Sequence, residues 1–340
     1  VKRLREEVNF NGYIHVKAIP GASEELIYSA GLLADRISIN MELPTEESLK
    51  TLAPNKPINN ILRPMNSISK TIANHRVAIG KNARFERGSL SKSLVGVRPS
   101  GFISDKGFNY PAEINDEKLK RPFAPAGQST QMIIGATSER DLDIIRTTQN
   151  LYRGFDLKRV FYSAYIPLNQ DETLPDLDTP VPLLREHRLY QADWLLRYYG
   201  FDAEELLTED NPYFDDRIDP KCEWAIRHIG DFPVEINTAS PDVLLRVPGI
   251  GITGVKKIIS ARRYGNINFE MLKKMRITLK RAQYFITCNG KMLYRIPFEQ
   301  SFIRNRIADL EHTEIMELRG ETLQCTQMNL FSDFKLASGN

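Results

Sequence analysis

The chain has 340 residues, of which 41% are hydrophobic and 26% are charged, and its formal net charge at pH 7 is +3. These values predict a globular protein with two domains, or with one large domain and an appendage. No apolar run approaches the roughly 20 residues that span a bilayer. The charged N-terminus also lacks the pattern of a signal peptide, which argues against a secreted protein.

Three cysteines, Cys222, Cys288 and Cys325, are odd in number and far apart in the sequence. They predict a reducing, cytoplasmic environment and no disulfide framework. Their spacing excludes a local metal or iron–sulfur cassette. The chain begins at Val1 in a pattern typical of a helix interior, so we expect a fragment that has lost an N-terminal segment.

Hydrophobic periodicity and capping residues predict alternating helices and strands. In chain order we expect a helix over 1–8, a strand over 12–19, a helix over 23–30, a strand over 35–43, helices over 45–52 and 60–78, a strand over 129–136, a helix over 138–152 capped by Ser138, a strand over 157–166 and a helix over 180–199. Such alternation implies parallel βαβ units, in an open or closed (β/α) barrel or in a doubly wound sheet. The segment 81–121, rich in Gly, Ser, Asn and Lys, is expected to be an insertion.

Polar residues at the predicted strand ends are the first candidates for a ligand site. Ser38, Asn40 and Glu42 alternate with apolar residues, and Lys17 ends the first predicted strand. Both faces of a parallel sheet are normally covered, so we expect a polar barrel lumen; a solvated sheet face would give the same alternation. The C-terminal strand ends carry the ligand site in either architecture, which favours Glu42. Lys17 would hold a carboxylate or extend along a barrel rim, and Gly135 would allow a close approach or a tight turn.

The remaining chain divides by composition. Residues 201–233 are acidic and irregular and predict a linker with a short helix near 221–229. Residues 234–290 predict a small helical module that includes two short helices over 269–287. Residues 291–340 form a tail to which the patterns assign no structure.

The segment 236–265 is the most informative part of the chain. A short apolar helix leads through VPGIG (247–251) into a Lys/Arg-rich helix. The two glycines permit a tight turn, and the following helix N-terminus favours an anion through its backbone N–H groups and its dipole. We expect a nucleic-acid phosphate to bind at Gly249, Gly251, Thr253, Gly254, Lys256 and Lys257.

The charge of this region supports that expectation. Ten basic residues and one acidic residue, Glu270, lie between Arg246 and Arg281, which gives a net charge of +9. Since the whole chain carries +3, the remainder carries −6. A basic island on an acidic protein is the footprint of a phosphate-binding module. The alternative is a tight αα-hairpin used for packing or protein contact, with a solvated basic face.

The segment 236–265 resembles the helix-hairpin-helix motif of DNA repair and DNA-uptake proteins. Three other segments, RISINMELPTEESLK (36–50), MIIGATSERD (132–141) and YSAYIP (162–167), resemble the fourth, fifth and sixth strands of radical S-adenosylmethionine (radical SAM) enzymes. With HVKAIPGA, FAPAGQSTQMIIGAT, LKRVFYSAYIP, PLLREHRLYQADWLLRYYGF and LKRAQYFITCNGK, most of residues 1–290 resembles the DNA modification/repair radical SAM proteins. Members of that family are often encoded beside a uracil-DNA glycosylase-like protein.

The resemblance implies an α/β fold: a partial TIM-like (β/α) barrel over 1–200 that lacks its first strands, followed by a helix-hairpin-helix domain over 234–290. It implies S-adenosylmethionine at the strand ends, near Lys17, Asn40, Glu42 and Gly135, and a [4Fe–4S] cluster. The family's Cys-x3-Cys-x2-Cys loop is absent from this chain. We therefore expect the cluster cysteines upstream and a fragment that is inactive alone.

The function implied is a radical SAM enzyme of DNA modification or repair that binds DNA non-specifically through its hairpin. DNA and a uracil-DNA glycosylase-like protein are the expected partners, with no membrane. The alternative is a non-catalytic DNA-binding or repair-scaffold protein in which the barrel is only a support.

Overall fold

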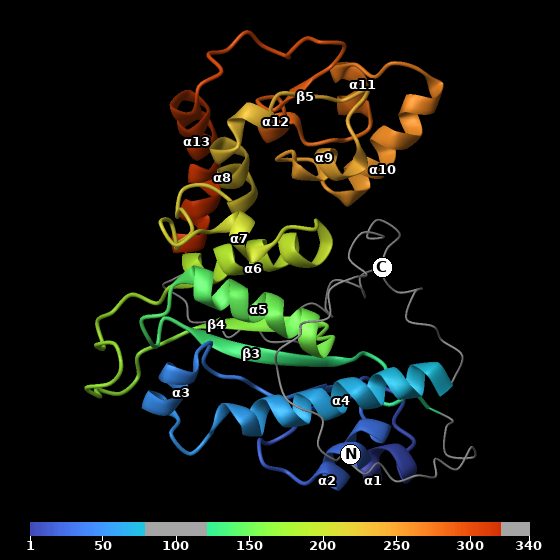
Figure 1. Ribbon diagram of the computed structural model, residues 1–340, viewed down its shortest axis with the longest axis vertical. Helices are drawn as coiled ribbons and strands as arrows, with labels where there is room; N and C mark the ends of the chain where they lie inside the picture. The colour runs from blue at the N-terminus through green and yellow to red at the C-terminus, as the bar shows by residue number, and fades with distance from the viewer. Residues whose placement is uncertain (79–120, 321–340) are drawn as a thin grey trace, which may run out of the picture. The chain divides into compact units, whose positions relative to one another are not determined.

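The computed structural model describes residues 1–78 and 121–320, so nearly all of the expected insertion lies outside the described residues. The chain forms two compact units (Figure 1). The first comprises Val1–Thr179 and Ala192–Tyr213, and the second comprises Pro180–Gln191 and Phe214–Asn340. No helix in the described ranges is long and apolar enough to cross a membrane.

The first unit is built on a parallel sheet. Among the described residues its strands are β1 (His15–Lys17), β2 (Arg36–Ser38), β3 (Gln128–Ile134) and β4 (Arg159–Ala164), hydrogen-bonded in the order β1-β2-β3-β4. All neighbouring pairs are parallel. The α/β class and the parallel βαβ arrangement predicted from the sequence are therefore confirmed.

The helices of this unit follow the predicted pattern. They are α1 (Lys2–Glu6), α2 (Glu24–Leu33), α3 (Glu46–Leu52), α4 (Ile58–Ala78), α5 (Asp141–Phe155) and α7 (Ala203–Leu206), while α6 (Leu183–Tyr198) contributes residues to both units. Helix α4 contacts both β3 and α5 (Figure 1). Ser23 and Thr45 cap α2 and α3 through their side-chain oxygens, as Ser and Thr at the N-cap usually do.

The predicted Ser138 cap is wrong. Helix α5 begins at Asp141, and its N-cap is Arg140. The Asp143 carboxylate accepts the Arg140 backbone N–H at 3.3 Å and its guanidinium at 2.8 Å. An acidic residue in the first turn stabilises the helix start without a Ser at the cap.

The strand register divides the sheet into two chemically different faces. One face carries Ile37, Ile39, Met132, Ile134 and Val160, each no more than 1% exposed. The pairs Lys17↔Ser38, Ser38↔Ser129 and Gln131↔Phe161 place Lys17, Ser38, Ser129 and Gln131 on the other face, together with the Phe161 ring. The first face is the core of the unit, and the second is the surface on which a ligand site can form.

The second unit contains mainly short helices. Its elements are α8 (Pro220–Arg227), η2 (Ile229–Asp231), β5 (Val234–Glu235), α9 (Pro241–Arg246), α10 (Ile252–Ala261), η3 (Arg262–Tyr264), α11 (Phe269–Lys274), α12 (Leu279–Ala282), β6 (Ile286–Thr287) and α13 (Gln300–Gly320). Strands β5 and β6 pair in parallel, and α13 contacts α8. Part of the expected tail is therefore a helix, whereas Cys325 lies outside the described residues.

The segment 201–233, expected to be an acidic linker with a short helix near 221–229, contains the boundary between the two units and helix α8. Residues up to Tyr213 belong to the first unit, where α7 contacts α5, and the second unit resumes at Phe214. Leu206 and Leu207 are at most 1% exposed. Most apolar residues of the segment are thus buried, whereas acidic residues such as Glu204, Glu209 and Asp216 are exposed.

Glu235, at the end of β5, connects this strand with the turn after β6. Its carboxylate accepts backbone N–H groups from Asn237 at 3.0 Å, Asn289 at 3.1 Å and Gly290 at 2.8 Å. The Thr287 hydroxyl donates a further bond at 3.0 Å. Burial alone would raise the pKa of Glu235, but the N–H donors outweigh it and lower the pKa to about 2.

We predict that Glu235→Gln lowers the free energy of unfolding by about 2–3 kcal/mol at pH 7. Because the pKa of Glu235 is lower in the folded protein than in the unfolded chain, its stabilisation is complete above about pH 4.5 and is lost as the pH falls towards 2. The difference between wild type and variant should therefore shrink by about half at pH 3. Urea unfolding at both pH values, with the exposed Glu270→Gln as control, measures this; an equal loss at pH 7 and pH 3 would contradict it.

Candidate functional site

The turn between α9 and α10 is the first part of the candidate site. Ser240 caps α9, and Pro241 occupies its first turn. After Arg246 the chain passes through the fully buried Val247 and reaches Gly249 at φ +81°. Gly251 is the N-cap of α10. This is the tight helix–turn–helix geometry that the two glycines predict.

Gly249 is required for two separate reasons. Its positive φ is strained for residues with a side chain. A Cβ at this position would also lie 2.7 Å from the Thr278 carbonyl oxygen and 3.2 Å from the Ala282 nitrogen. The turn therefore packs directly against the backbone of α12 and the residue before it.

The start of α10 presents unbonded backbone N–H groups. Gly251 supplies no side-chain cap, and the first N–H groups of a helix have no partner within it. Within residues 1–78 and 121–320, the N–H groups of residues 251–254 have no acceptor. Thr253 and Lys256 are exposed at this end of α10. A ten-residue helix with such an N-terminus favours an anion.

The structure divides the ten basic residues into two groups. Four have partners within the unit. The Arg246 guanidinium lies 5.0 Å from the centre of the Trp224 ring, and Arg281 pairs with Asp219 at 3.5 Å. Lys257 donates a hydrogen bond to the Met275 carbonyl at 2.8 Å. Arg262 donates to the Ile236 carbonyl at 2.7 Å and to the Ala239 carbonyl at 2.6 Å. The other six are exposed: Lys256, Arg263, Lys273, Lys274, Arg276 and Lys280. The expected phosphate contact through Lys257 therefore competes with a backbone hydrogen bond, whereas Lys256 is open to a ligand.

The segment α11–α12 repeats the turn geometry of α9–α10, which the sequence reading did not detect. Three pairs of residues 27 positions apart correspond: Gly249 and Arg276 have positive φ, Ile250 and Ile277 are buried, and Gly251 and Thr278 are N-caps. The repeat could have been found from apolar residues 27 positions apart, such as Val255 and Ala282, which are both buried. The repeat is not obvious in the sequence, because the second turn contains no glycine.

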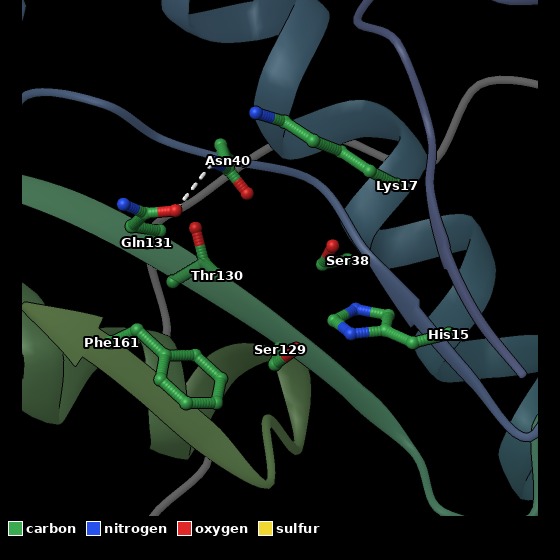
Figure 2. A pocket seen from close by; sticks show the side chains of 8 residues that line it. All are labelled: His15, Lys17, Ser38, Asn40, Ser129, Thr130, Gln131 and Phe161. Atoms are coloured by element: carbon green, nitrogen blue, oxygen red, sulfur yellow. Dashed lines mark hydrogen bonds between the residues drawn. The ribbon is translucent and has the colours of Figure 1, made fainter. Parts of the chain in front are cut away.

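A second candidate region is the polar face of the sheet. It holds a cavity of about 180 Å³. Figure 2 shows the side chains that line it, which are His15, Lys17, Ser38, Asn40, Ser129, Thr130, Gln131 and Phe161. Asn40 donates to the Gln131 side chain at 3.1 Å. The Ser129 hydroxyl is buried and has no hydrogen-bond partner among the described residues.

An aromatic ring and a histidine complete the cavity. The Arg159 guanidinium lies 4.8 Å from the centre of the Phe161 ring. Desolvation and the nearby Arg36 lower the pKa of His15, which favours its neutral imidazole. The cavity therefore offers neutral polar groups, an apolar ring and the charged amine of Lys17.

The strand-end residues expected to hold a cofactor lie partly together. Lys17 Nζ lies 3.6 Å from Glu42 Oε1, and Lys56, which the sequence reading missed, lies 3.4 Å from the same oxygen. Glu42 has φ +67° and is held by backbone bonds to Gln131 and Ile133. Asn40 lines the cavity together with Lys17.

The two ends of β3 differ in backbone conformation and in sequence pattern. Gly135 follows β3 directly, with φ +86°. The strand expected over 129–136 begins one residue earlier, at Gln128, and ends at Ile134. Residues 128–131 are all polar, so the two-residue alternation of polar and apolar residues that marks a half-buried strand is missing at its start.

The described cysteines do not form a cluster site. Cys222 and Cys288 are buried, and burial raises the pKa of the Cys288 thiol to about 12. In the described part of the chain, no group of three His, Cys, Asp or Glu side chains is placed to hold a metal ion. Both cysteines behave as small apolar residues.

Comparison of the chain with protein-family models, with curated proteins and with solved structures gave no match.

We predict that Gly249→Ala lowers the free energy of unfolding by about 2–4 kcal/mol, because left-handed strain and overpacking add. The matched control is Gly290→Ala, which has φ +74° but open space around its Cβ, and which should cost only about 1 kcal/mol. Urea unfolding of both variants checks this. Equal losses would show that the contact with Thr278 does not constrain the turn.

Proposed function

We propose that the second unit binds nucleic-acid phosphates without sequence preference through the turn 249–255. The observation that carries this proposal is the open N-terminus of α10 behind a glycine turn, beside exposed basic side chains. Backbone N–H groups and lysines recognise the phosphate backbone, which positions a protein on DNA but does not specify a sequence.

We further propose that the chain belongs to a radical SAM protein of DNA modification or repair. Two features of the first unit support this. Its strands follow one another in the sheet in chain order, as in an arc of a (β/α) barrel, and one face of the sheet is polar. In this proposal Lys17, Asn40, Glu42 and Gly135 hold S-adenosylmethionine, and DNA and a uracil-DNA glycosylase-like protein are the partners in the cytoplasm.

The cysteines of this chain do not fit a [4Fe–4S] cluster. Three thiolates at the spacing of a cluster loop are required, and Cys222, Cys288 and Cys325 do not provide that spacing. A cluster would have to be bound by cysteines outside this chain. We therefore derive no chemical step through it.

A scaffold protein without catalysis is the second candidate. The observation that favours it is the ion pairing at the strand ends, where Lys17 and Lys56 already surround Glu42. The Glu42 carboxylate thus has ion-pair partners without a ligand, so the sheet could serve only to support the DNA-binding unit.

The test of DNA binding is a salt series on duplexes of unrelated sequence. We predict similar affinities for all duplexes and a steep loss of affinity with salt. Lys256→Glu should weaken binding about tenfold and reduce the salt slope by about 1, since one phosphate contact is lost. Lys2→Glu, an equal charge change on α1, is the control. Salt-independent binding, or a Lys256→Glu variant that binds like Lys2→Glu, would count against the proposal.

The cofactor assignment is tested separately. We predict that Glu42→Gln weakens S-adenosylmethionine binding about tenfold, because the amide is a poorer acceptor for ribose hydroxyls than the carboxylate. Isothermal titration calorimetry measures the affinity, with Glu46→Gln on the exposed start of α3 as control. Unchanged affinity in Glu42→Gln would remove this residue from the site. DNA binding without any S-adenosylmethionine binding would favour the scaffold.

A further inference from the structure

Helix α8 supports the phosphate-binding turn through a buried lysine. Lys221 lies in the first turn of α8, whose N-cap Asp219 accepts the backbone N–H of Lys221 at 2.9 Å. The residue is only 8% exposed, although lysine is rarely buried. Its Nζ donates to the Ile250 carbonyl at 2.7 Å. This carbonyl lies between the two glycines of the turn.

The bond to Ile250 has a direct consequence for the next residue. In a trans peptide the C=O of one residue and the N–H of the next point in opposite directions. With the Ile250 carbonyl directed towards Lys221, the Gly251 N–H points away from Lys221. This N–H is one of the groups at the start of α10 that have no acceptor among the described residues.

We propose that Lys221 is a positioning residue for phosphate binding: through the Ile250–Gly251 peptide it aims the Gly251 N–H at the ligand, and its charge polarises that peptide from behind. The inference rests on the proposed function, because it assigns the phosphate site to the same turn. The sequence gives no hint of it, since Lys221 is 28 residues from the first glycine of the turn.

The electrostatics of the position support this role. Burial lowers the pKa of Lys221 to about 7, while Asp219 and Cys222 raise it and Arg246 lowers it further. A buried ammonium group is costly unless an interaction compensates it, and perturbed pKa values concentrate at functional sites. A bound phosphate would favour the protonated form, so phosphate binding and protonation of Lys221 would support each other.

The sign of the pH dependence follows from this coupling. Below about pH 7 Lys221 is charged and phosphate binds more tightly; as the pH rises above 7 the charge is lost and binding weakens. A lysine that only filled space in the fold would give no such dependence of DNA affinity on pH.

The experiment measures duplex affinity of the full chain at pH 6.5 and pH 8.5 over a salt series, for wild type, Lys221→Met, Lys221→Gln and the exposed Lys274→Met. We expect Lys221→Met to bind about tenfold more weakly at pH 6.5, the effect of losing one charge-assisted hydrogen bond. Its salt slope should stay unchanged, because Lys221 displaces no counterion from DNA. Lys274→Met should instead reduce the slope by about 1 if Lys274 contacts a phosphate directly.

Lys221→Gln keeps a side-chain donor but cannot be protonated. We expect it to fold, to bind with intermediate affinity and to lose the fall in affinity between pH 6.5 and pH 8.5 that the wild type shows. If Lys221→Met does not fold, the pH profiles of Lys221→Gln and of the wild type still show whether Lys221 supports phosphate binding.

The inference is overturned if the wild type binds DNA and the Lys221 variants bind equally well, or if all share one pH profile. Failure of the proposed function looks different: the wild type itself then shows no salt-dependent binding, and both proposals fall together.

Discussion

The backbone conformation of Gly249 is the constraint on which the second unit depends. Its positive φ reverses the chain between α9 and α10, and its missing side chain lets the Thr278 carbonyl approach the turn. The close approach brings two similar turns, 27 residues apart, against each other. Arg262 reinforces the arrangement by binding the Ile236 and Ala239 carbonyls. The open N–H groups of α10 are thus fixed by packing, so they need no ordering when an anion binds.

The first unit depends on a different constraint, which is the two-residue period of its strands. Because adjacent strands are paired in register, the buried apolar residues Ile37, Met132 and Val160 share one face, and Lys17, Ser38, Ser129 and Gln131 share the other. The polar face combines the neutral amides of Asn40 and Gln131 with the charged group of Lys17, Lys56 and Glu42. Lys17 belongs to both groups, because it lines the cavity and pairs with Glu42.

Much of the fold could be predicted from the sequence. The four strands are recognisable by β-branched runs, and Ser23 and Thr45 mark helix starts through local capping chemistry. The turn between α9 and α10 was predicted because a glycine in a turn has a strong local signature. Local signals failed at α5, where Arg140 is the N-cap and Asp143 binds it, in place of the expected Ser138 cap.

The site was less predictable, because its contacts join residues that are distant in the sequence. Composition counts ten basic residues, but it cannot tell that Lys257 and Arg262 bind carbonyl groups while Lys256 is exposed. The pairing of Lys56 with Glu42 and the bond from Lys221 to Ile250 depend on how helices fold back onto the strands and the turn. No periodicity or spacing encodes these pairs, so only the three-dimensional structure identifies them.

The central claim is that the backbone N–H groups at the start of α10 bind a phosphate. The most direct measurement is a titration of the isotopically labelled chain with a short DNA duplex, followed by amide chemical shifts in ¹H–¹⁵N correlation spectra. The account predicts that the amides of Gly251, Ile252, Thr253 and Gly254 shift most, and that amides on the polar face of the sheet shift less. Shifts that leave residues 249–255 unchanged while DNA binds elsewhere would contradict it.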